Sequence, residues 1–302
     1  MKTEAVKQSS SFTIGGKLRE YMLLVKMSLS IMVVFSAVVS YLLAPQVQFF
    51  WQRILLIALG GFLVTGSANA VNQIVEKDTD ALMKRTAKRP VASGVMSSQE
   101  AWLFAIITLI AGLFILGWYF NLTSAIIALA SWFMYAYMYT PMKKVSSYSV
   151  LMGAVPGALP CLIGWTAGFP AGGEIDWAGG WALFGIQFFW QFPHFWAIAW
   201  IAHKDYTAAG FKMLPSDAGQ TKFSAIQAII YSLLLLPVGL IPYFIGMSGM
   251  VSLWIILVAN IIMVVQSVRL YNEMSAKAAR RLMFSSYIHL PIVLLSLLAD
   301  KV

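Results

Sequence analysis

The sequence predicts an all-α integral membrane protein, a bundle of nine transmembrane helices with a central cavity open to the cytoplasmic side. The chain of 302 residues is 60% hydrophobic and only 11% charged. Apolar runs long enough to cross roughly 30 Å of hydrocarbon, which takes about 20 helical residues each, recur along it. A closed β-barrel is excluded, because these runs are continuous and do not alternate in polarity.

Each predicted span is one continuous apolar run. In chain order the spans cover residues 22–44, 52–76, 100–119, 122–140, 148–168, 180–202, 223–246, 249–271 and 282–299. No connection is long enough for a separate soluble domain, so we expect one domain over residues 1–302, with residues 1–21 as a cytoplasmic arm. The first run lacks a small-residue cleavage site and is predicted to be an uncleaved helix.

Lys and Arg fall almost entirely on one side of these nine spans. Of the 21 basic residues, all but Arg53 and Lys301 lie in or within a few residues of the arm and the even-numbered connections, which therefore face the cytoplasm. This predicts a multi-pass protein with a cytoplasmic N-terminus and a C-terminus on the outer side. The net charge of +9 indicates topology and contact with the lipid bilayer, not nucleic-acid binding. A single cysteine excludes an internal disulfide or a thiolate metal cluster.

A polar ladder emerges from the second span in the stretch "NQIVEKDTDALMKRTAKRP". Asn72, Glu76 and Asp80 are spaced by four, so a helix continuing through them would place them on one face, about 6 Å apart. Such carboxylates can hold Mg²⁺, which completes its shell with water and phosphate oxygens. Asp78 points away from this face and is a weaker candidate. Because the charged connections at 77–99 and 203–222 are long, the site is expected to open to the cytoplasm.

Four bases follow the ladder directly, and guanidinium groups suit phosphate oxygens. They are Lys84, Arg85, Lys88 and Arg89. A basic flank with acidic counter-charges is the alternative, since such flanks are the rule. Polar groups at membrane depth are costly, however, and favour a functional interpretation, here a magnesium–diphosphate site. The lysines of "YTPMKK" at 139–144 are interpreted as positive-inside charge alone.

The sixth predicted span carries a polar stripe within an aromatic helix. Gln187, Gln191 and His194 have i, i+4, i+7 spacing, and Trp190 belongs to the surrounding ring of tryptophans. Gln and His can join transmembrane helices by hydrogen bonds, which is the structural alternative. We expect instead the wall of a cavity for a large flat ligand.

Lys204, Asp205 and Tyr206 follow that span on the cytoplasmic side. Asp205 could supply another metal ligand or orient Lys204. Together with "YTPMKK", "GALPCLIGW", "WQFPHFWAIAW" and "DYTAAGFKMLP", the ladder stretch resembles the protohaem IX farnesyltransferase (haem O synthase) family of the UbiA-type intramembrane prenyltransferases. These motifs run from about residue 72 to 215.

The resemblance implies transfer of a farnesyl group from farnesyl diphosphate to the 2-vinyl group of haem B in a bacterial inner membrane. Water addition and diphosphate release would give haem O for terminal oxidases. It also implies diphosphate-bound Mg²⁺ as cofactor and haem B as substrate. A downstream haem A synthase or a terminal oxidase assembly would be the protein partner.

Carried over position by position, the resemblance implies metal binding by the ladder, with Asp78 at the intervening acidic position. It implies diphosphate binding by Arg85 and Arg89, with Lys84 and Lys88 beside them. Asp205 and Tyr206 correspond to the second cytoplasmic motif. His194 would either ligate haem iron or handle a proton. A quinone-precursor prenyltransferase, and a haem or ion carrier, remain as alternative functions.

Overall fold

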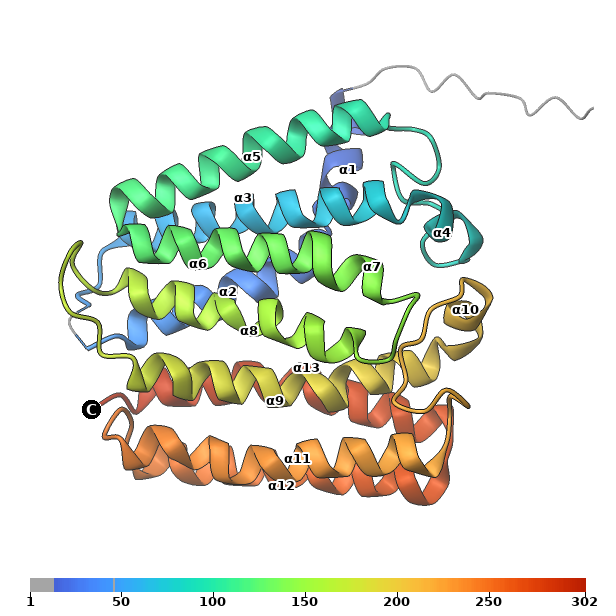
Figure 1. Ribbon diagram of the computed structural model, residues 1–302. Coiled ribbons are helices and arrows are strands. Elements are labelled where there is room, and N and C mark those ends of the chain that lie inside the picture. The colour runs from blue at the N-terminus through green and yellow to red at the C-terminus, as the bar shows by residue number, and fades with distance from the viewer. Residues whose placement is uncertain (1–13, 46) are drawn as a thin grey trace, which may run out of the picture.

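The computed structural model describes residues 14–45 and 47–302, so residues 1–13 of the expected arm lie outside the described residues. Every regular element in these two ranges is a helix. Figure 1 shows the long helices packed side by side in one bundle. The all-α fold class is therefore confirmed.

The long helices correspond in order to the predicted spans. They are α2 (Met27–Leu43), α3 (Trp51–Val75), α5 (Ser98–Tyr119), α6 (Leu122–Phe133), α8 (Ser149–Ala167), α9 (Ala178–Ile201), α11 (Lys222–Phe244), α12 (Met250–Glu273) and α13 (Ala276–Ala299). Shorter elements are α1 (Ile14–Leu24), α4 (Lys77–Leu82), the π-helix η1 (Met134–Tyr139), α7 (Thr140–Met142) and α10 (His203–Ala208).

The predicted number of spans is not confirmed. Within the described ranges, seven helices are long and apolar enough to cross a membrane, and the bent pair α1–α2 would make an eighth. Helix α9 forms where the sixth span was predicted but is not among them. We attribute this to the polar stripe, which interrupts its apolar run.

Polar caps set where several helices begin. Ser97, Asn121, Thr221 and Ser275 each accept a hydrogen bond from the backbone N–H three residues later. This satisfies one of the donors that the first turn of a helix leaves without a partner. Asn121 also donates to the carbonyls of Thr166 and Phe169, which ties the start of α6 to the end of α8.

The fourth predicted span is irregular at its cytoplasmic end. Helix α6 passes into the π-helix η1, and Pro141 follows in α7. Proline has no N–H to donate, so the regular α-helical ladder cannot continue through it. The Thr140 hydroxyl donates to the Tyr135 carbonyl at 2.8 Å, and the same carbonyl accepts from the Thr140 backbone N–H. Tyr139 ends this π-helix, and Lys143 follows the short α7.

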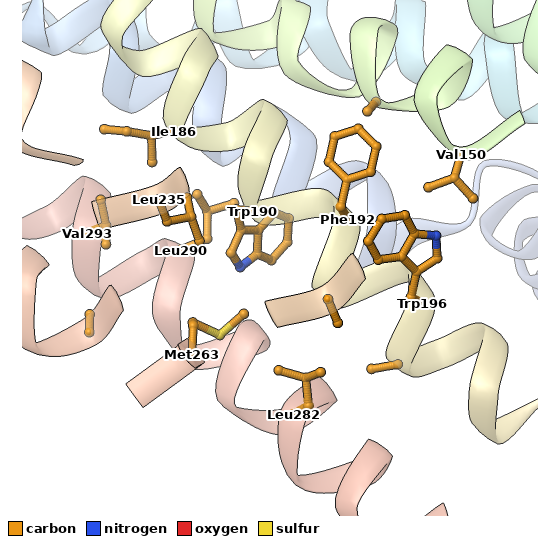
Figure 2. Close-up of a cluster of buried hydrophobic side chains, with 14 of the residues drawn as sticks. Val150, Ile186, Trp190, Phe192, Trp196, Leu235, Met263, Leu282, Leu290 and Val293 are labelled. Atoms are coloured by element: carbon orange, nitrogen blue, oxygen red, sulfur yellow. The ribbon is translucent and has the colours of Figure 1, made fainter. Parts of the chain in front are cut away.

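Helix α9 lies in the centre of its half of the bundle, in contact with α8, α11 and α13. Figure 2 shows its side chains Trp190, Phe192 and Trp196 among apolar residues of the neighbouring helices. Close packing of these large aromatic surfaces stabilises this half through van der Waals contacts. Because α9 is covered by protein, its polar residues must find their partners inside the bundle.

Candidate functional site

A pocket lies at the end of the bundle that carries α4 and α10, which Figure 1 shows at the same end. Its lining combines two acids, four bases, one amide and aromatic or thioether side chains. These residues are Lys26, Asn72, Glu76, Asp80, Met83, Arg85, Arg89, Tyr139, Lys143, Tyr206, Phe211 and Met213. The pocket therefore receives side chains from four parts of the chain: the α1–α2 break, the end of α3 with the segment after it, the region around α7, and the connection that contains α10.

Asn72, Glu76 and Asp80 lie on one face, as expected, although no single helix contains all three. Helix α3 ends at Val75 and α4 begins at Lys77. The backbone still keeps helical spacing, because the N–H of Glu76 donates to the Asn72 carbonyl at 3.0 Å and that of Asp80 to the Glu76 carbonyl at 2.7 Å. All three side chains are buried and line the pocket.

Each ladder residue is paired with one basic side chain. Lys26 Nζ donates to Asn72 Oδ1 at 2.6 Å. Lys143 Nζ lies 2.8 Å from Glu76 Oε1. Arg89 Nη1 lies 2.6 Å from Asp80 Oδ2. The interpretation of Lys143 as positive-inside charge alone is therefore wrong, because this lysine is buried and points into the pocket.

Glu76 and Lys143 stay ionised together. Burial alone would raise the pKa of Glu76, but Lys143, with Lys26 and Arg89 nearby, outweighs it and lowers that pKa below its usual value. Burial alone would lower the pKa of Lys143, but Glu76 outweighs it and raises that pKa above its usual value. Opposite charges at hydrogen-bonding distance favour both charged forms. The pocket thus keeps these charges at neutral pH.

The ladder provides ligands suited to a hard cation. Asp80 Oδ1 is buried and has no hydrogen-bond partner among the described residues. A buried carboxylate oxygen of this kind is costly unless something binds it. Within the described ranges, however, no group of three or more His, Cys, Asp and Glu side chains is placed to hold a metal ion. The available set is two carboxylates and one amide, which fits Mg²⁺ with further oxygens from a diphosphate.

Arg85 joins the two charged connections. Its guanidinium donates to the Tyr206 hydroxyl at 3.3 Å, and the group lies 5.9 Å from the centre of the Tyr206 ring. This contact links the segment after α4 to α10, and both side chains line the pocket. Arg85 itself is exposed and has no acidic partner among the described residues, so its charge is available to an anion.

Several predicted site residues are not brought to the pocket. Asp78, Lys84, Lys88 and Lys204 are exposed, Asp205 is half-buried, and none of these five lines it. Asp78 lies on the opposite side of the short helix α4 from Asp80, as its spacing indicates. Lys26 and Lys143 line the pocket but were not predicted as site residues. Lys143 belongs to "YTPMKK", and Lys26 belongs to none of the motifs.

His194 is buried between α9 and α13. Its Nδ1 lies 2.7 Å from the Ser286 hydroxyl, and that hydroxyl donates to the Met283 carbonyl at 2.6 Å. The hydroxyl therefore accepts, and Nδ1 carries the proton. This leaves Nε2 as the nitrogen with a free lone pair. The ring stacks on Trp190 with centroids 4.7 Å apart.

The two glutamines of the stripe bind the neighbouring helix α8. Gln187 Nε2 donates to the Gly157 carbonyl at 2.6 Å. Gln191 Nε2 donates to the Ala154 carbonyl at 3.1 Å. These contacts correspond to the structural alternative of interhelical hydrogen bonding. A role for either glutamine at a ligand stays a prediction.

Comparison with known proteins gives a consistent picture. The profile described as "UbiA prenyltransferase family" matches residues 33–289. A protoheme IX farnesyltransferase of Cytophaga hutchinsonii is 44% identical over 289 residues, covering 96% of this chain and 100% of that protein. The enzyme of the same name from Flavobacterium johnsoniae is 41% identical over 283 residues, covering 91% and 92%.

Solved structures share the fold at low sequence identity. A structure described as digeranylgeranylglyceryl phosphate synthase has a TM-score of 0.73 at 20% identity, covering 94% of this chain and 98% of that one. A UbiA homolog from Archaeoglobus fulgidus, bound to DMAPP and Mg²⁺, has a TM-score of 0.62 at 17% identity, covering 90% and 99%. At such identities the likeness shows the fold alone.

Proposed function

Because the chain belongs to the UbiA prenyltransferase family, we infer that it transfers a farnesyl group from farnesyl diphosphate to the 2-vinyl group of haem B. The inference is supported by relatives named protoheme IX farnesyltransferase at 40–44% identity across at least 91% of the chain. The observation that carries it in this molecule is the charged pocket, in which a polar ladder faces four basic side chains.

The residues of the pocket divide by charge. Asn72, Glu76 and Asp80 would hold Mg²⁺, which when bound would offset charge on the diphosphate oxygens. Lys26, Lys143, Arg85 and Arg89 line the same pocket and would bind those oxygens directly. The bond between farnesyl C1 and oxygen breaks as charge builds on the leaving diphosphate. Basic groups already held in place stabilise that charge without reorganisation.

The allylic group must then meet the acceptor before it meets water. Its C1 forms a bond with the outer carbon of the vinyl group, water supplies a hydroxyl to the inner carbon, and one proton is released. The aromatic surroundings of α9 exclude bulk water from the bundle, and aromatic faces also stabilise a passing cation. Both effects favour carbon–carbon bond formation over hydrolysis.

His194 is proposed to ligate the haem iron through Nε2. A histidine that binds a metal usually donates its other ring N–H to a neighbouring acceptor, which fixes the tautomer. Here Nδ1 donates to Ser286, at 2.7 Å. The alternative of proton handling would instead require Nε2 to reach a transferable proton.

The number of spans, the membrane and the orientation of the chain are proposed as well. We propose nine spans in a bacterial inner membrane, with α9 as a protein-covered span and the pocket open to the cytoplasm. The basic composition of that end supports this orientation. The product haem O would pass to a haem A synthase or a terminal oxidase assembly.

Acceptor choice tests the proposed function. Membranes containing the chain are incubated with labelled farnesyl diphosphate, Mg²⁺, and either haem B or 4-hydroxybenzoate. We expect label in haem and none above background in the benzoate. Label in the phenolic acceptor alone would favour a quinone-precursor prenyltransferase. Haem uptake into vesicles without any labelled product would favour a carrier.

A further inference from the structure

The chain breaks sharply between α1 and α2. The chain bends by 56° from α1 to α2. Lys26, at the junction, has φ 50° and ψ 60°. This left-handed conformation is unfavourable for a residue with a Cβ atom, and glycine adopts it more easily. Among the described non-glycine residues only Lys26 and Met274 have positive φ. A lysine held there indicates that its side chain is needed.

The Lys26 side chain enters the candidate site. Its amine donates to Asn72 Oδ1 at 2.6 Å and lines the pocket. Asn72 Nδ2 in turn donates to Thr140 Oγ1 at 3.3 Å. The break is thereby connected to the site through a single side chain.

Two amides of α3 hold the break in place. Gln73 Nε2 donates to the carbonyls of Leu23 and Leu24 at 2.9 and 3.0 Å. Asn69 Nδ2 donates to the carbonyl of Val25 at 3.0 Å. The Leu23 and Leu24 carbonyls end α1, where carbonyls lack α-helical partners, and the Val25 carbonyl follows directly. The Leu23 carbonyl also accepts from the Lys26 N–H at 3.3 Å, and the Val25 carbonyl from the Ser30 hydroxyl at 2.6 Å. Three consecutive carbonyls immediately before Lys26 are thus bound by α3.

The surface of α3 is also shaped to receive the break. Gly66 lies one turn before Asn69, and a Cβ atom there would come within 3.1 Å of Val25 Cγ1. Gly66, Asn69 and Gln73 share one face of the helix. Their arrangement lets the backbone at 23–25 approach α3 closely enough for the amides to reach its carbonyls.

This arrangement has a cost that apolar packing would avoid. Asn69 Oδ1 and Gln73 Oε1 are buried and have no hydrogen-bond partner among the described residues. An orphaned acceptor in the interior lowers stability, and each one requires an explanation. Fixing the geometry of Lys26 gives such an explanation.

Building on the proposed function, we propose that Asn69 and Gln73 are positioning residues. They hold the left-handed turn at Lys26 and so direct its amine towards the diphosphate, without touching a substrate themselves. Their contribution to diphosphate binding must then pass through Lys26. A residue that only stabilised the fold would not depend on that amine.

A double-mutant cycle tests this dependence. The dissociation constant of inorganic pyrophosphate with Mg²⁺ is measured by calorimetry on the full chain in nanodiscs, for the parent, Gln73→Met, Lys26→Met and the double variant. We expect each single variant to weaken binding by about tenfold. The double variant is expected to bind no more weakly than Lys26→Met alone, because coupled residues do not act additively.

The matched control is Ser67→Ala. Ser67 is also buried on α3 and donates to a backbone carbonyl of another helix, that of Ala105 at 2.7 Å. Its hydroxyl also accepts from Trp132 Nε1 at 2.9 Å, so its hydrogen bonds join α3 to α5 and α6 and not to the break. Its pyrophosphate affinity should stay within about twofold of the parent value. Asn69→Leu serves as the second variant if Gln73→Met does not fold, with the same expected coupling to Lys26→Met.

The outcomes separate this inference from the function on which it rests. Additive losses, or unchanged binding by a folded Gln73→Met or Asn69→Leu variant, would overturn the positioning role alone. A loss in Ser67→Ala equal to that in Gln73→Met would overturn it as well. Failure of the parent chain to bind pyrophosphate would overturn both the proposed function and this inference.

Discussion

Asp80→Asn is expected to lower kcat/KM for farnesyl transfer by about a thousandfold, which corresponds to ~4 kcal/mol of transition-state stabilisation. Asp80 is fully buried and pairs with Arg89 at 2.6 Å, and its other oxygen has no partner within residues 14–45 and 47–302. The substitution removes the charge that would hold Mg²⁺ and keeps the shape of the side chain. Steady-state kinetics with labelled farnesyl diphosphate and haem B measure the effect.

Asp78→Asn is the matched comparison for Asp80. It removes a carboxylate two residues away on the same short helix, but Asp78 is exposed and lies outside the pocket lining. We expect a loss of less than about tenfold. Thermal unfolding of both variants shows whether the bundle is intact. A folded Asp80→Asn variant that kept most of its activity would contradict the assigned role.

His194→Ala is expected to abolish haem transfer and to weaken haem binding by at least about a hundredfold, while pyrophosphate binding is retained. His194 would supply the ligand to the haem iron, so its loss should weaken haem binding. It lies on α9 and does not line the pocket that contains the ladder, so pyrophosphate binding should be kept. A Soret titration measures haem binding. Calorimetry with pyrophosphate measures the other site.

Exogenous imidazole distinguishes ligation from packing in the His194→Ala variant. If the lost side chain was an iron ligand, imidazole should occupy the space and restore a ligated haem spectrum. Equal loss of haem and pyrophosphate binding, with no response to imidazole, would indicate that His194 only packs α9 against α13. Proton handling would give a third pattern, with haem binding kept and product formation lost.

The polar ladder could be predicted because its geometry is local. Spacing by four fixes a common face wherever the backbone stays helical, and the hydrogen bonds at Glu76 and Asp80 maintain that spacing across the gap between α3 and α4. The polar stripe of α9 was predicted for the same reason. Its partners on α8 and α13 were not, since periodicity identifies a face but not what packs against it.

Lys26 and Lys143 could not be assigned from the sequence. Their partners are 46 and 67 residues away along the chain. Each lysine lies at an irregular backbone segment. Lys26 is itself the left-handed residue between α1 and α2, and Lys143 follows the π-helix η1 and the short α7. The stretch around Lys26, "LLVKMSL", contains no Gly or Pro to mark a break, so the run 22–44 was predicted as one straight span.

Haem extracted from cells tests the central claim most directly. Cells that contain haem B and farnesyl diphosphate but no other haem-modifying prenyltransferase are grown with the parent chain, with Asp80→Asn, or with neither. Mass spectrometry of the extracted haem measures the product. We predict haem B carrying one added farnesyl and one added hydroxyl group with the parent chain only. Unmodified haem B in cells whose membranes contain the folded parent chain would contradict the account.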